Sequence, residues 1–157
     1  ARVVINGSGY ESNGAKTKIV VADLQSGEII DSVLVGGGGS LLQISPIDSN
    51  IAVVSVQNTG GTLYIIDLAT SKVTTLHEHE DSDDSRRRVS SISFTRSGDR
   101  FIACDTRGKF TVWSMGSQPH LITQSENVSD GSVNCALNNF GDKAVVSSDI
   151  GVRLYPW

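Results

Sequence analysis

The 157-residue sequence lacks most features that mark a helical, membrane-spanning or disulfide-rich protein. It has only three prolines and two cysteines, Cys104 and Cys135. Both cysteines fall in strand-like runs, so we expect them to be buried free thiols of a reducing compartment. No apolar run reaches the roughly 18 residues that a membrane-spanning helix needs. No segment of useful length shows a helical period either, which leaves an all-β protein with many turns.

The charge and the rarity of histidine exclude several functional classes. A net charge of −4 provides no electrostatic basis for general nucleic-acid binding, so no nucleic-acid partner is expected. The sequence has no Gly-x-Ser-x-Gly, phosphate-binding loop, Cys-x-x-Cys or His-Glu-x-x-His motif. The pair His77 and His79 stands among carboxylates, but such a pair in a charged loop is ordinarily solvent-facing. We therefore predict no catalytic residue, no cofactor, no metal site and no enzyme activity.

The clearest positive pattern runs from Val89 to Met115. Three short apolar runs are separated by turn residues at 97–99 and 106–109. Glycine and aspartate favour tight turns because both tolerate positive φ. The runs are too short for helices, and the third is rich in aromatic and β-branched residues. The stretch predicts three antiparallel strands joined by tight turns.

The same meander recurs along the chain. The pairs at 22–23, 66–67, 113–114 and 155–156 are spaced by 44, 47 and 42 residues. A period of about 40–45 residues with four strands per unit is typical of a β-propeller blade. We predict an all-β fold of about four four-stranded antiparallel meanders, the first and last incomplete with three strands each. A single propeller segment, 1–157, is expected to comprise units near 1–35, 41–76, 89–123 and 133–157.

The repeats resemble those of the WD40 family over essentially the whole chain. Residues 94–101, Phe-Thr-Arg-Ser-Gly-Asp-Arg-Phe, resemble the strand–turn–strand core of a blade, and Trp113-Ser114 stands where the family has Trp-Asp. Members most often have seven blades, so the resemblance implies that this chain is part of a larger propeller. The family's Gly-His dipeptide is missing, so its Asp–His–Ser/Thr–Trp network cannot be completed. Trp113 is therefore expected to pack in the core.

Two glycine-rich stretches interrupt the pattern. Residues 6–17 are polar and are predicted to form a long loop between strands at 2–5 and 18–24. Residues 36–40, Gly-Gly-Gly-Gly-Ser, are identical to a common engineered linker unit, and they are either an artificial splice or a native loop. As a linker, this segment would be mobile and would tolerate changes of length.

The resemblance implies a non-catalytic protein–protein interaction scaffold in a multisubunit complex, cytoplasmic or nuclear. In such blades, with strands lettered a to d, partners usually bind the b–c and d–a loops. Carried over, these loops are 58–61, 77–88, 107–109, 127–131 and 149–151. The predicted partner-binding residues are His77, His79, Arg86, Arg87, Arg88, Arg107, Lys109 and Asp149. Self-association, or pairing with remaining blades on another segment, is also expected because an open row of blades exposes apolar faces.

An alternative reading stays open. The run Ile66-Asp67-Leu68-Ala69-Thr70 also resembles the Tyr-Val-Thr-Asn propeller repeats of extracytoplasmic proteins. That resemblance implies an extracytoplasmic enzyme or ligand-binding protein. The triplets at 6–8 and 127–129 match the N-glycosylation sequon, and their occupancy would favour this alternative.

Overall fold

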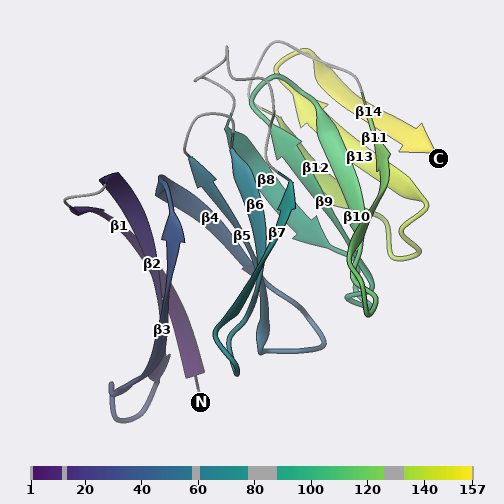
Figure 1. Cartoon of the computed structure of the whole chain (residues 1–157). Helices are drawn as coiled ribbons and strands as arrows, with labels where there is room; N and C mark the ends of the chain where they lie inside the picture. Colours follow the sequence, from purple (N-terminus) through teal and green to yellow (C-terminus); the bar gives the residue numbers. More distant parts are fainter. Residues whose placement is uncertain (1, 12–13, 58–60, 78–87, 126–132, 157) are drawn as a thin grey trace.

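The computed structural model describes residues 2–11, 14–57, 61–77, 88–125 and 133–156. These residues form fourteen strands in four antiparallel sheets, which stand side by side in a row (Figure 1). The sheets have three, four, four and three strands, so the predicted fold class is confirmed. Within the described ranges, no helix is long and apolar enough to cross a membrane.

Each sheet is a simple meander whose strands follow chain order. The first sheet contains β1 (Arg2–Glu11), β2 (Gly14–Asp23) and β3 (Ile29–Gly36). The second contains β4 (Gly38–Ile44), β5 (Ile51–Gln57), β6 (Thr62–Asp67) and β7 (Lys72–His77). The third contains β8 (Val89–Phe94), β9 (Arg100–Asp105), β10 (Phe110–Ser114) and β11 (His120–Gln124). The fourth contains β12 (Asn134–Leu137), β13 (Lys143–Ser148) and β14 (Gly151–Pro156).

The core consists of three apolar layers, one between each pair of neighbouring sheets. Because side chains alternate along a strand, Val54 of β5 packs toward the first sheet while Val53 packs toward the third. The two central sheets are therefore covered on both faces, and each end sheet is covered on one. Trp113 is buried and stacks on Phe101 with ring centroids 6.4 Å apart, which confirms its predicted place in the core.

The structure corrects the prediction of a loop at residues 6–17. β1 and β2 form one long hairpin in which Asn6 pairs with Ile19 and Gly9 pairs with Lys16. Glycine and serine weaken the side-chain pattern from which a strand is recognised, but their backbone groups join the ladder as any others do. Thr17 is buried at the inner face, and its Oγ1 donates to the Gly37 carbonyl over 2.9 Å.

Residues 36–40, expected to be either an artificial splice or a native loop, form the junction between β3 and β4. Gly36 ends β3, Gly38 begins β4, and only Gly37 lies between them. The N–H of Gly37 donates to the Ala15 carbonyl over 3.0 Å, and the φ of Gly37 is 96°. A Cβ on Gly38 would lie 3.2 Å from that of Ala15. The segment is a close crossover between the first two sheets, where glycine is needed both for φ and for space.

The expectation that both cysteines are free thiols is wrong as well. Cys104 of β9 and Cys135 of β12 form a disulfide that joins the third sheet to the fourth, with Cα atoms 6.2 Å apart. Both residues are buried in the apolar layer between these sheets. The runs are strands, as predicted, but the two cysteines are 31 residues apart and only the packing of adjacent sheets brings them together.

Candidate functional site

The strands that precede the loops assigned to partner binding by the resemblance all end on one side of the sheets. These strands are β5, β7, β9, β11 and β13, and their ends lie at the top of Figure 1. We call the described part of this end the rim; it comprises residues 61, 77, 88, 105–109 and 148–151. The predicted partner-binding residues that the structure describes all lie on the rim.

Three basic residues, Arg88, Arg107 and Lys109, lie on two segments that contact each other at the rim. The backbone N–H of Thr106 donates to the carbonyl of Arg88 over 2.9 Å, and the N–H of Arg88 faces the Thr106 Oγ1 at 3.4 Å. This contact holds the entry to β8 against the β9–β10 turn, which carries Arg107 and Lys109. Arg88 and Arg107 are exposed and Lys109 is half-buried. These three predicted residues therefore lie on neighbouring segments of the rim.

A buried carboxylate shapes the turn that carries two of these residues. Asp105 is 4% exposed, and its Oδ1 accepts the N–H groups of Arg107 and Lys109, each over 2.9 Å. The N–H of Gly108 donates to the Asp105 carbonyl over 3.2 Å, and the φ of Gly108 is 76°. Our sequence analysis did not single out Asp105. Its position directly before Thr-Arg-Gly is the available signal, because aspartate side chains bond to backbone N–H groups two residues on.

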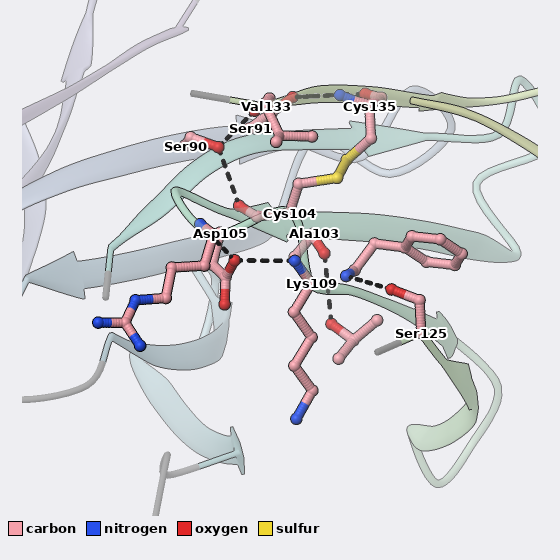
Figure 2. Close-up of a disulfide and its surroundings, with 12 residues drawn as sticks. Ser90, Ser91, Ala103, Cys104, Asp105, Lys109, Ser125, Val133 and Cys135 are labelled. Carbon is pink, nitrogen blue, oxygen red and sulfur yellow. Dashed lines mark hydrogen bonds between the residues drawn. A yellow bond between two sulfur atoms is a disulfide. The ribbon is translucent and has the colours of Figure 1, made fainter. Parts of the chain in front are cut away.

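The rim turn is continuous with the disulfide. Cys104 directly precedes Asp105, whose carboxylate is turned toward the backbone of Lys109 (Figure 2). On the other side, the Ser90 hydroxyl lies against the carbonyls of both Cys104 and Val133. The rim of the third sheet is therefore tied to the start of β12 by side chains as well as by the disulfide.

Of the other predicted partner-binding residues, the structure describes Asp149 and the backbone of His77. Asp149 is exposed in the β13–β14 turn, at the same end of the neighbouring sheet. The backbone of His77 ends β7 opposite Leu63, and only its backbone is described. His79, Arg86 and Arg87 lie outside the described residues. In the part of the chain that is described, no group of three or more His, Cys, Asp or Glu side chains is placed to hold a metal ion.

The opposite end of the sheets is built from aspartate turns. The hydroxyl of Thr70, together with the Ala69 N–H, lowers the pKa of Asp67. The hydroxyls of Ser97 and Thr95 lower the pKa of Asp99. The pKa values of Asp23 and Asp31 are lowered by the backbone N–H of Ser26 and by the hydroxyl of Ser71, respectively. Three of these carboxylates shape their own turns, whereas Asp31 of β3 contacts Ser71 of the second sheet. These contacts favour a structural role for this end.

Comparisons with known proteins identify the fold. No family model and no curated protein matches the sequence. A chain of the mitotic checkpoint complex is similar in structure, with a TM-score of 0.67, 13% identity and coverage of 96% of this chain and 50% of that chain. The β-propeller domain of Myceliophteria thermophila Cps50 (Swd1) gives a TM-score of 0.65, 17% identity and the same coverage. The four sheets are therefore blades of a β-propeller fold, and this chain spans half the length of these two similar chains.

Proposed function

We propose that this chain is a non-catalytic scaffold of an intracellular multiprotein complex, cytoplasmic or nuclear, that binds a protein partner through the rim. The observation that carries the proposal is that Arg107 and Lys109 lie on a turn held by Asp105, and that the backbone of Arg88 contacts this turn at Thr106. A rigid fold that presents charged loops is well suited to recognition, because little conformational freedom is lost on binding.

The basic residues indicate the chemistry of the partner. Guanidinium groups pair with carboxylates through two parallel hydrogen bonds, and arginine is enriched among residues that contribute most to binding energy. We propose that an acidic segment of the partner lies across Arg88, Arg107 and Lys109. Arg86 and Arg87 would extend the same contact, and Asp149, His77 and His79 would contact the flanks of the partner. The similar chain from the mitotic checkpoint complex supports a role in an assembly.

A charge reversal tests this proposal. Substitution of Arg88, Arg107 and Lys109 by Glu should weaken binding to co-purifying partners and reduce its dependence on salt, while the melting temperature changes by only a few degrees. The matched control reverses Lys72, Arg96 and Lys143, which are exposed at the opposite end. Equal loss of binding in both variants, or none in the rim variant, would contradict the proposal.

The disulfide favours a second candidate, an extracytoplasmic propeller enzyme or ligand-binding protein. Disulfides persist in oxidising compartments and are rare in the cytosol. The pairing of Cys104 with Cys135 is what this candidate would require. Glycan occupancy at Asn6 or Asn127 in protein from its native source would establish the extracytoplasmic candidate and exclude the intracellular one.

A further inference from the structure

The disulfide lies where two blades and the rim meet. Cys104 is 1% exposed near the end of β9, and Cys135 is 6% exposed near the start of β12. One cysteine directly precedes the carboxylate that holds the basic turn, and the other follows the β11–β12 connection. Figure 2 shows the disulfide together with Asp105 and Lys109. The bond therefore joins the strand that leads into the basic turn of the rim to β12 of the neighbouring sheet.

Without the disulfide, these segments would be held by the apolar layer between the third and fourth sheets and by a few polar contacts. The Ser91 hydroxyl donates to the Cys135 carbonyl over 3.3 Å, and the Cys135 N–H donates to the Ser91 Oγ over 3.4 Å. Both distances are long for hydrogen bonds, so they contribute little. The Ser90 hydroxyl bridges the carbonyls of Cys104 and Val133. Because Ser90 belongs to β8, this contact connects β9 to the start of β12 only indirectly. The disulfide adds a direct covalent link between β9 and β12.

We propose that the Cys104–Cys135 disulfide is a redox-dependent clamp on the rim: oxidised, it holds the 105–109 turn, and reduced, it lets this turn and the start of β12 loosen. The inference rests on the proposed function in that the rim is the partner-binding surface. In an intracellular protein a disulfide is ordinarily transient and responsive to redox conditions, which fits a regulatory clamp.

The chemistry is ordinary thiol–disulfide exchange with a dithiol. A thiolate of the reductant attacks one of the two sulfurs, the S–S bond breaks, and a mixed disulfide forms. The second thiol of the reductant then displaces the chain's sulfur, and the reductant leaves as a disulfide. Two electrons and two protons have passed to Cys104 and Cys135, which become thiols. Reaction with an oxidised dithiol runs the same steps in reverse.

Burial makes the exchange depend on the state of the rim. A reductant reaches the sulfurs only when β9 and β12 separate locally, because both cysteines are almost fully covered. Whatever holds the rim closed should therefore slow reduction. By thermodynamic reciprocity, reduction should weaken the binding of a partner that favours the closed rim.

The first test is a thiol count on the intact chain. The protein is unfolded without reductant in the presence of an alkylating agent and weighed by mass spectrometry. No alkylation is expected before reduction, and alkylation of two cysteines is expected after it. Alkylation of both cysteines in most of the unreduced protein would show that the disulfide does not form and would overturn the proposal.

The second test compares amide hydrogen exchange before and after treatment with dithiothreitol. Reduction should speed exchange at Arg107, Lys109 and Cys135 by about tenfold or more, whereas peptides from 51–57 and 62–67 should be unchanged. Trypsin cleavage after Arg107 and Lys109 should accelerate in parallel. Equal exchange of the rim amides in both states would overturn the clamp.

Control variants separate the clamp from general destabilisation. Val54→Ala removes buried methyl groups from the layer between the first two sheets, so it should not selectively loosen the rim. Cys104→Ser with Cys135→Ser should match the reduced protein and should not respond to dithiothreitol. If this double variant does not fold, the reduced natural sequence still decides the question. Because these experiments need no partner, the clamp and the proposed function can fail independently.

Discussion

At the scale of single residues, several turns depend on glycine. Gly98, Gly108, Gly141 and Gly151 have φ values of 68°, 76°, 69° and 131°, which confirms the expectation that these turns need positive φ. Space is also limited at two of them. A Cβ on Gly98 would lie 2.6 Å from Ile47 Cγ1, and one on Gly141 would lie 2.8 Å from Arg100 Cδ.

We predict that Gly98→Ala and Gly141→Ala each lower the free energy of unfolding by about 1 kcal/mol or more, since alanine is strained at positive φ. Denaturant titration of each variant measures the change. Gly116→Ala is the control, because its φ is not positive and its new Cβ would lie 3.9 Å from the nearest atom. Neutral effects at both turn positions would mean that these turns relax without cost.

At the scale of elements, side-chain carboxylates organise the turns opposite the rim. The Asp67 Oδ1 accepts the N–H groups of Ala69 and Thr70 over 2.9 and 3.2 Å. The Asp99 carboxylate accepts the hydroxyls of Thr95 and Ser97. All of these bonds favour the ionised carboxylate, which is why the two pKa values are lowered.

These turns predict how stability depends on pH. A carboxylate whose pKa is lower in the folded state stabilises the fold above its ordinary value of 3.8, and the contribution is lost as pH falls through the folded pKa. The melting temperature should therefore decline as pH falls below about 4. Asp67→Asn combined with Asp99→Asn should make the decline shallower. If the melting temperature of this double variant falls as steeply between pH 5 and 3 as that of the unaltered protein, the acid sensitivity arises from other groups.

A second prediction at this scale concerns the β3–β4 crossover. Insertion of two glycines after Gly37 should displace the Gly37 N–H from the Ala15 carbonyl and the Gly37 carbonyl from Thr17. We expect a melting temperature lowered by several degrees, since about two hydrogen bonds are lost. The same insertion after Gly116, in the exposed β10–β11 turn, is the control. If both insertions change the melting temperature equally little, residues 36–40 act as a passive linker.

At the scale of the whole molecule, the row of blades has two uncovered faces. Val152 and Leu154 of β14 are 70% and 60% exposed, and they lie on one face because they are two residues apart in a strand. At the other end of the row, Ile5 and Leu34 are each 54% exposed. In the second and third sheets, neighbouring blades cover both faces.

The uncovered faces predict that the chain by itself self-associates. Exposed apolar faces of this kind favour contact between copies, so sedimentation should show species larger than the monomer as concentration rises. Val152→Lys with Leu154→Lys should shift the protein toward the monomer. Ile47→Lys with Phe140→Lys is the control, because both are highly exposed apolar residues of turns. A monomer at all concentrations would contradict the prediction.

The sequence by itself determined the elements that depend on local patterns. Apolar runs of strand length, turn glycines and a period near 44 residues predicted the four meanders, because strand and turn preferences act over a few neighbouring residues. Only the tertiary structure decided the Cys104–Cys135 bond, the contact of Arg88 with Thr106 and the pairing of Gly37 with Ala15. Each joins segments whose proximity depends on how one sheet packs on the next or how one strand pairs with another. No local preference along the chain encodes that proximity, so the proposed binding surface and the proposed clamp could be inferred only from the fold.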